Sequence, residues 1–125
     1  AFVVAWIRHL ASPRMPPDPR VRKVAQWLRQ AVDHNPSVEQ YASRLNVSPS
    51  YLHSLFKKEM GVTPKQYRLH CRLEQARQAL RSGNLPIAEV AAAAGFSSVN
   101  YFYRQFTRHF QETPAAYRAR VRGYK

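Results

Sequence analysis

Two stretches of this chain are similar to each other, and this internal repeat constrains the fold more than any other feature of the sequence. The segment FKKEMGVTPKQYR (56–68) returns as FTRHFQETPAAYR (106–118) at an offset of 50, with Phe, Thr-Pro and Tyr-Arg in step. Further upstream, three more residues correspond at an offset of 49: Ala42 with Ala91, Val47 with Phe96, and Ser48 with Ser97. We therefore expect two copies of one supersecondary unit, with the extra residue of the second copy inside its second helix.

Each copy predicts a short helix, a tight turn and a second helix. Asn46 and Gly95 occupy the two turns, and these residue types best tolerate the left-handed backbone that a sharp turn between helices requires. The next residue of each copy is apolar and would fill the angle between the helices. Ser48 would cap the second helix of the first copy, and Ser97 or Ser98 that of the second, the repeat favouring Ser97. This order is typical of a helix-turn-helix motif, present twice.

The rest of the sequence predicts further helices and no strand, because no segment alternates apolar and polar residues. Asp18-Pro19 is expected to begin the first helix, as an N-cap acceptor followed by a proline. Other helices are expected at 37–45, 48–60, 63–81 and 86–94, from 97 or 98 to 110, and after Thr113-Pro114. The predicted fold class is all-α, with about seven helices in two helix-turn-helix subdomains joined by a long linker helix. The expected parts are an apolar tail and Pro-rich linker (1–17), the first subdomain (18–62), the linker helix (63–82) and the second subdomain (83–125).

Two apolar stripes are expected to face the core. The first helix presents Val21, Val24, Ala25, Leu28 and Val32, and the long helix presents Leu69, Leu73, Ala76 and Leu80. Trp6 and Trp27 are expected to pack rather than to stack on bases, and His34, His70 and His109 to lie at the surface or half-buried. Gln111 stands where the first copy has Gly61, which would cost about 1 kcal/mol if that position is left-handed.

The charge of the chain points to an anionic partner. Lys and Arg number 20 against 7 Asp and Glu, a formal net charge of +13. Nucleic acid phosphates and an anionic membrane surface are the usual sources of counter-charge. The apolar stretch at residues 1–10 is half the length that spans a bilayer and lacks the features of a signal peptide, so no membrane segment is expected. Because the chain begins without Met, we interpret it as a fragment.

Catalytic and metal-binding residues are not evident in the sequence. Cys71 is the single cysteine, which excludes an intrachain disulfide, and five scattered histidines do not form a metal-ligand cluster. No nucleophile elbow, Gly-rich phosphate loop or carboxylate pair is present. We therefore expect no enzyme activity, no cofactor and no metal, and a reducing cytoplasm as the location, in association with the nucleoid.

The repeat resembles the DNA-binding domain of the AraC/XylS family of bacterial transcription regulators. The segment IAEVAAAAGFSSVNYFYRQFTRHFQETPAAYR (87–118) is similar to the family signature, and YASRLNVSPSYLHSLFKKEMGVTPKQYR in the first half is similar too. The resemblance covers about residues 18–122. It implies sequence-specific binding to double-stranded DNA and regulation of bacterial transcription. It also implies an effector-sensing or dimerisation domain N-terminal to this chain, and RNA polymerase as a further candidate partner.

The resemblance carries base-contacting positions onto the second helix of each motif. In the first copy these are Ser50, His53 and Ser54; the equivalent exposed positions of the second copy are Val99, Asn100, Tyr103 and Arg104. Their chemistry suggests a bidentate contact of Arg104 with guanine, of Asn100 with adenine, and a contact of Val99 with a thymine methyl. A phosphate contact of Arg104 stays open as the alternative.

Other basic residues are candidates for phosphate contacts. These are Lys57, Lys58, Lys65 and Arg108, together with the helix N-terminal amides capped by Ser48 and Ser97. The repeated pairs Tyr67-Arg68 and Tyr117-Arg118 fit a structural brace better than a DNA contact.

The linker helix is expected to be roughly 27 Å long, which suits two helices placed about 34 Å apart in successive major grooves. Rival hypotheses are binding to RNA or any polyanion without sequence preference, and a purely protein-binding helical module. An AraC-like domain fused to a DNA-repair methyltransferase is disfavoured by the single cysteine.

Overall fold

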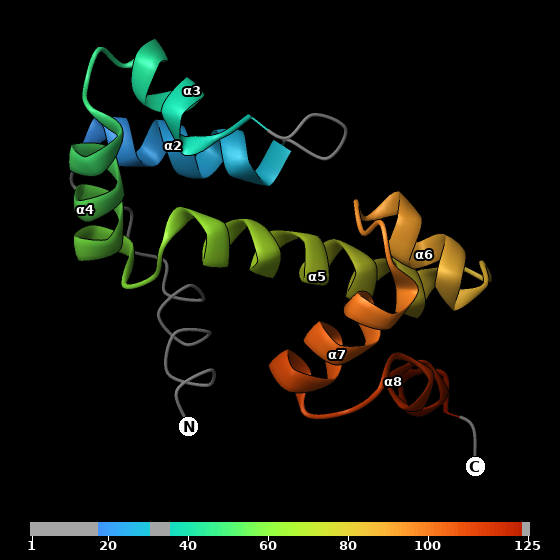
Figure 1. Cartoon of the computed structure of the whole chain (residues 1–125). Helices are drawn as coiled ribbons and strands as arrows, with labels where there is room; N and C mark the ends of the chain where they lie inside the picture. The colour runs from blue at the N-terminus through green and yellow to red at the C-terminus, as the bar shows by residue number, and fades with distance from the viewer. Residues whose placement is uncertain (1–17, 31–35, 124–125) are drawn as a thin grey trace. The chain divides into compact units, whose positions relative to one another are not determined.

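The structure is a computed structural model that describes residues 18–30 and 36–123. Over these ranges the chain forms seven α-helices and no strand, which confirms the predicted all-α fold (Figure 1). The helices are α2 (Pro19–Gln30), α3 (Val38–Arg44), α4 (Pro49–Met60), α5 (Pro64–Ser82), α6 (Ile87–Ala93), α7 (Val99–Phe110) and α8 (Pro114–Val121). Two compact units meet within α5, between His70 and Cys71. The predictions made for residues 1–17, Val32 and His34 fall outside the described residues.

The first unit contains α2, α3, α4 and the beginning of α5. Asp18 begins α2 as predicted, because its Oδ1 accepts a hydrogen bond of 2.8 Å from the backbone N of Arg20. The side-chain hydrogen bond from Arg20 also lowers the pKa of Asp18. Helices α2 and α3 both pack on α4. Their buried side chains are Val21, Val24, Ala25, Leu28, Tyr41, Ala42, Leu52 and Phe56.

Trp27 has a packing role, as predicted. Its ring stacks on Tyr41, with centroids 5.3 Å apart and an interplanar angle of 18°. The guanidinium of Arg44 lies 5.3 Å from the centroid of Trp27 and 5.5 Å from that of Tyr41. The half-buried indole thus ties α2 to α3.

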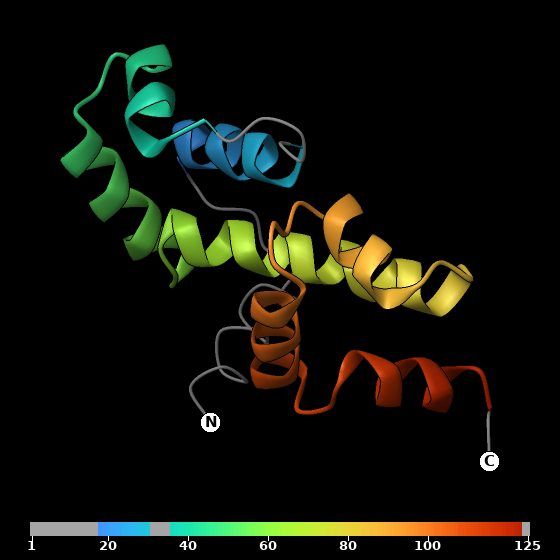
Figure 2. The same ribbon diagram turned by 45° about the vertical axis from the view of Figure 1, so that its right-hand side comes forward.

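The second unit contains the rest of α5 with α6, α7 and α8. Helices α6 and α8 each pack on α7, which crosses between them (Figure 2). The long helix contributes Leu73, Ala76 and Leu80 to the core, as predicted, whereas Leu69 is only half-buried. The facing side chains are Val90, Ala91, Phe96, Phe102, Phe106 and Tyr117. Phe106 contacts three aromatic rings, those of Phe102, Phe110 and Tyr117.

Each of the repeated Tyr-Arg pairs braces its own unit from within, as predicted. Arg68 donates from Nη2 to the carbonyl of Pro36, just before the N-cap of α3. Arg118 donates from Nη1 to the carbonyl of Leu85 over 2.7 Å, just before α6, and from Nε to the carbonyl of Leu80 over 3.2 Å. Both tyrosines of the pairs are buried. Each arginine therefore holds the chain that enters the first helix of its helix-turn-helix motif.

His109 is buried, with 5% of its surface exposed, and this corrects the expectation of a surface or half-buried position. It lies in the last turn of α7, and its ring meets that of Phe110 edge-on at 4.8 Å. The aromatic pattern of α7 places this side of the helix towards the core, which the polar character of the histidine had obscured. His70 is half-buried, as expected.

Candidate nucleic-acid interface

The two helix-to-helix turns have the same backbone hydrogen bonds. The N–H of Val47 donates to the carbonyl of Ala42 over 3.1 Å, and that of Phe96 to the carbonyl of Ala91 over 3.0 Å. Between them Asn46 and Gly95 adopt the predicted left-handed conformation, with φ of 57° and 96°. This is the Schellman arrangement that ends a helix and reverses the chain.

Gly95 is also placed against a neighbouring side chain. A Cβ at this position would lie 3.2 Å from Nε of Arg72 on α5. The backbone conformation and the close approach of Arg72 therefore both favour glycine.

The cap of α7 is the second of the two serines that the sequence offered, and not the one that the repeat favoured. Ser98, not Ser97, accepts the capping hydrogen bond, from the backbone N of Tyr101 over 3.2 Å. Ser48 caps α4 as predicted, accepting from the backbone N of Tyr51 over 3.1 Å. Helices α4 and α7 are both 12 residues long. The extra residue of the second copy therefore lies in the turn, before the cap, and not inside the helix.

With the caps aligned, the base-contacting candidates correspond at one offset, Ser50 with Asn100, His53 with Tyr103 and Ser54 with Arg104. All of them except Tyr103 are exposed in the structure, and Val99 is exposed too. Tyr103 is half-buried and its ring meets Phe102 edge-on at 6.2 Å. Each set lies in the first half of its helix, which is the part of a recognition helix that contacts base edges.

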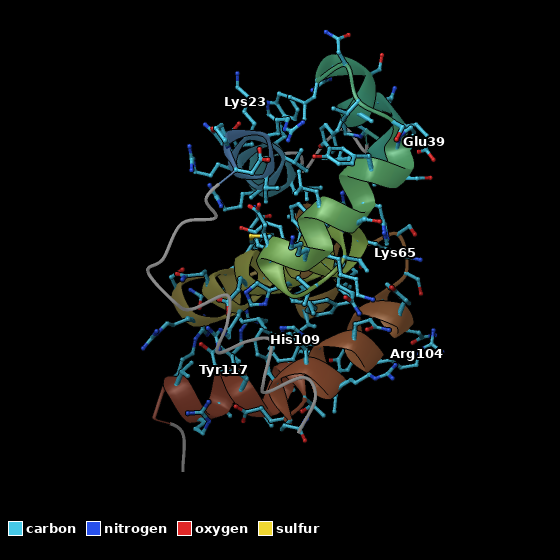
Figure 3. All side chains as sticks on the ribbon, turned by 90° about the vertical axis from the view of Figure 1, so that its left-hand side faces the viewer. Lys23, Glu39, Lys65, Arg104, His109 and Tyr117 are labelled. Carbon is cyan, nitrogen blue, oxygen red and sulfur yellow. The ribbon has the colours of Figure 1, made fainter. Side chains whose placement is uncertain are left out.

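Arg104 extends outward from α7, whereas His109 lies on the inner side of the same helix (Figure 3). The guanidinium is 5.9 Å from the ring centroid of Tyr101, one turn earlier. This cation–π contact holds the guanidinium towards the N-terminal half of α7. Buried Phe102 and Phe106 fix the opposite face of the helix, as predicted.

The candidates for phosphate contacts are all exposed. They are Ser48, Lys57, Lys58, Lys65, Ser97 and Arg108. Among the described acidic residues, Asp18, Glu74 and Glu112 form salt bridges with Arg20, Arg77 and Arg120. The surface lysines and Arg108 are not part of these pairs, so their charge is available to an anion.

Tyr51 and Tyr101 were not identified from the sequence, although the repeat aligns them. Both hold the third position of their helix and are exposed, by 47% and 39%. The guanidinium of Arg20 lies 5.3 Å from the centroid of Tyr51 and donates to its hydroxyl over 3.2 Å. Because that oxygen accepts from Arg20, its own hydrogen is available to an acceptor in solvent. The signal in the sequence that could have revealed them is that a tyrosine recurs at the same position of both helices.

A hollow of about 480 Å³ lies beside the base-contacting candidates of the first unit. It is lined by Val38, Glu39, Pro49, Ser50, His53 and Ser54. Helix α3 therefore contributes to the same surface as α4.

Residues 18–30 and 36–123 contain no group of three histidine, cysteine or acidic side chains that could hold a metal ion. Within the same ranges, no helix combines the length and the apolar character that crossing a membrane requires.

Two helix-turn-helix units with exposed, polar second helices define a DNA-binding class of protein. A family model described as a helix-turn-helix domain matches residues 41–120. A transcriptional regulator from Chromobacterium violaceum with an AraC-type DNA-binding domain is 31% identical, with a TM-score of 0.77 over 82% of this chain and 92% of that one. The chain belongs to the AraC type of helix-turn-helix DNA-binding domains.

Two further relatives bear on function. The DNA-binding domain of AdpA, a global transcriptional factor in complex with a target DNA, is 28% identical, with a TM-score of 0.76 over 85% of this chain and 96% of that one. YijO, an uncharacterised helix-turn-helix transcriptional regulator of Escherichia coli K12, is 32% identical over 94% of this chain. The alignment covers 43% of YijO, so this chain spans less than half the length of that relative.

Proposed function

We propose that this chain regulates bacterial transcription by binding double-stranded DNA in a sequence-specific way, with α4 and α7 in successive major grooves. The observation that carries the proposal is the pair of capped helices with polar side chains at equivalent positions. These are Ser50, His53 and Ser54 on α4, and Asn100, the half-buried Tyr103 and Arg104 on α7. Because the two faces differ, one chain would recognise an asymmetric site.

The second unit carries the stronger base-recognition chemistry. Arg104 would form a bidentate contact with guanine, Asn100 with adenine, and Val99 would contact a thymine methyl. Tyr103, being half-buried, would contribute through its outer edge. In the first unit, His53 can donate to guanine or accept from cytosine or adenine according to its protonation, and the two serines discriminate weakly.

Phosphate contacts would position the helices and supply most of the affinity. Lys57, Lys58, Lys65 and Arg108 are the exposed cations that we assign to this role. The N-terminal amides of α4 and α7 would bind phosphates as well, next to Ser48 and Ser97. We add Tyr51, whose hydroxyl is available as a donor beside the N-terminus of α4.

The remaining parts of the protein follow from this role. Residues 18–62 and 83–125 would form the two DNA-binding subdomains and 63–82 the helix between them. A sensing or dimerisation domain would precede residues 1–17, since the YijO relative is more than twice as long as the region it shares with this chain. We propose no enzyme activity, a cytoplasmic location, and RNA polymerase as a further partner.

Selection of bound duplexes from a random pool, at a stated salt concentration, tests the proposal. We expect an asymmetric consensus with two conserved blocks about one helical turn apart. Competition with RNA and with random duplex separates this outcome from general polyanion binding. Equal affinity for selected and random duplex at physiological salt would contradict the proposal.

A further inference from the structure

The hollow of the first unit joins two helices at the surface that we assign to DNA. Its α3 side contains Val38 and Glu39, and its α4 side contains Ser50, His53 and Ser54. Figure 3 shows Glu39 extending from α3 beside α4. A carboxylate thus lies at the edge of a surface whose other polar groups are hydroxyls and an imidazole, beside the apolar Val38 and Pro49.

Glu39 differs from most acidic residues of the described chain. Asp18, Glu74 and Glu112 are salt-bridged, and Glu59 accepts a hydrogen bond of 3.1 Å from the backbone N of Asp18. The Glu39 carboxylate has no hydrogen bond or ion pair to the residues in 18–30 and 36–123, and the same holds for Glu89 on α6. The unpaired charge of Glu39 is therefore free to meet a donor on a ligand.

The helix dipole explains why an acid lies in the first turn of α3, but not why it lies at the position that borders the hollow. An acid in the first turn of a helix is favoured by the helix dipole, and α6 has Glu89 in its own first turn. Aligning the two helices at Val38 and Ile87, however, matches Glu39 with Ala88. Only the first of the two motifs places an acid at this point of its surface.

The major groove limits which donor the carboxylate can meet. Guanine presents two acceptors, N7 and O6, and thymine presents the acceptor O4, so both would repel it. Adenine has an N6 amino donor, but its N7 acceptor lies alongside. Cytosine presents its N4 amino group as a donor, and glutamate accepts from that group in protein–DNA complexes. Phosphate oxygens would repel the carboxylate as well.

We propose that Glu39 is a specificity-determining residue of the first unit, its carboxylate accepting a hydrogen bond from N4 of a cytosine in the groove occupied by α4. The proposal rests on the proposed function and extends it. It assigns a sharp preference to a half-site that Ser50 and Ser54 would leave loosely specified. It also places part of the recognition on α3, outside the recognition helix.

The test compares the consensus of the full chain with those of Glu39→Gln, His53→Ala and Glu89→Gln, each by selection from a random pool. His53→Ala identifies the half-site of the first unit by the positions whose preference it changes. Within that half-site, Glu39→Gln should lose at least about fivefold of the preference for one cytosine and shift towards adenine, because glutamine pairs with N6 and N7 of adenine. Glu89→Gln removes the same charge from an unpaired acid of α6 and should leave every base preference unchanged.

The outcomes separate the two proposals. Identical base preferences in Glu39→Gln and the parent chain overturn the inference about Glu39, whether or not affinity for all duplexes rises. An equal change of preference in Glu89→Gln also overturns it, since the effect would then come from charge alone. If the parent chain itself selects no sequence, the proposed function fails together with the inference.

Discussion

Arg104 and its counterpart Ser54 are the most dissimilar pair among the aligned base-contacting candidates. The guanidinium offers five donors in a planar fork that matches O6 and N7 of guanine, whereas the serine has one short hydroxyl. Arg104 is exposed and supported by the ring of Tyr101 at 5.9 Å. The difference concentrates base recognition in the second unit.

Arg104→Ala should therefore weaken binding to the selected duplex by about 1–3 kcal/mol and relax the preference at one base pair. The measurement is the affinity for the consensus and for its single-base variants, by titration at fixed salt. Lys57→Ala is the matched control at an exposed cation of α4. It should weaken all duplexes to a similar degree and lower the salt dependence by about one counterion. An unchanged consensus for Arg104→Ala would move this residue to a phosphate contact.

Gln111 ends α7 in a left-handed conformation, with φ of 65° and ψ of 22°. Gly61 holds the same place after α4, with φ of 80°. The side chain of Gln111 recovers some of the cost, because its Nε2 donates to the carbonyl of Arg108 over 3.0 Å. The possible strain recognised from the repeat is therefore present, with a local hydrogen bond that the sequence did not reveal.

Gln111→Gly should raise the free energy of unfolding by up to about 1 kcal/mol, because glycine adopts this conformation without a Cβ clash. Gly61→Gln, the reciprocal change, should lower it by a similar amount. Denaturant unfolding followed by circular dichroism measures both. A loss of stability in Gln111→Gly would mean that the hydrogen bond to Arg108 outweighs the backbone strain.

At the scale of elements, the periodicity and the caps of the sequence predicted the helices well. Asp18, Ser48 and Thr113 each accept a backbone hydrogen bond at a helix start, and the left-handed turn residues were expected from their type. The cap of α7 was misassigned because two serines stand side by side and the repeat was aligned from the turn rather than from the helix. Backbone geometry, which sequence alone does not supply, decides between them.

Ser98→Ala should therefore lower the free energy of unfolding by about 1 kcal/mol, because it removes the acceptor for the backbone N of Tyr101. Ser97→Ala is the adjacent control and should change it by only a few tenths of a kcal/mol. Thermal or denaturant unfolding compares the two variants. A larger effect of the Ser97 substitution would restore the original assignment of the cap.

Other features of the candidate site could not be predicted from periodicity. The contact of Arg20 with Tyr51 joins residues 31 positions apart, and the hollow beside Glu39 depends on how α3 lies against α4. Helical spacing gives the face of one helix, but not which side chains of a second helix border it. The base-contacting positions came instead from the repeat and the family resemblance, and they remain predictions.

For the whole molecule, the proposal of two successive grooves makes the spacing of the DNA blocks critical. Inserting five base pairs between the two blocks of the selected site would turn one block by about half a turn, to the far side of the duplex. We expect affinity to fall to that of a duplex carrying one block alone. Electrophoretic mobility shifts with the parent and the spaced duplex measure this. Undiminished binding to the spaced duplex would contradict simultaneous recognition by one chain.

Helix α5 belongs to the cores of both units. Tyr67, near its start, is buried against Phe56 of the first unit, while Leu73, less than two turns later, is buried in the second. A continuous helix transmits the loss of its hydrogen-bonded turns to adjacent turns, because helix formation is cooperative. A helix-breaking substitution in the middle of α5 would therefore lower the stability of both units at once, although each unit has its own helix-turn-helix motif.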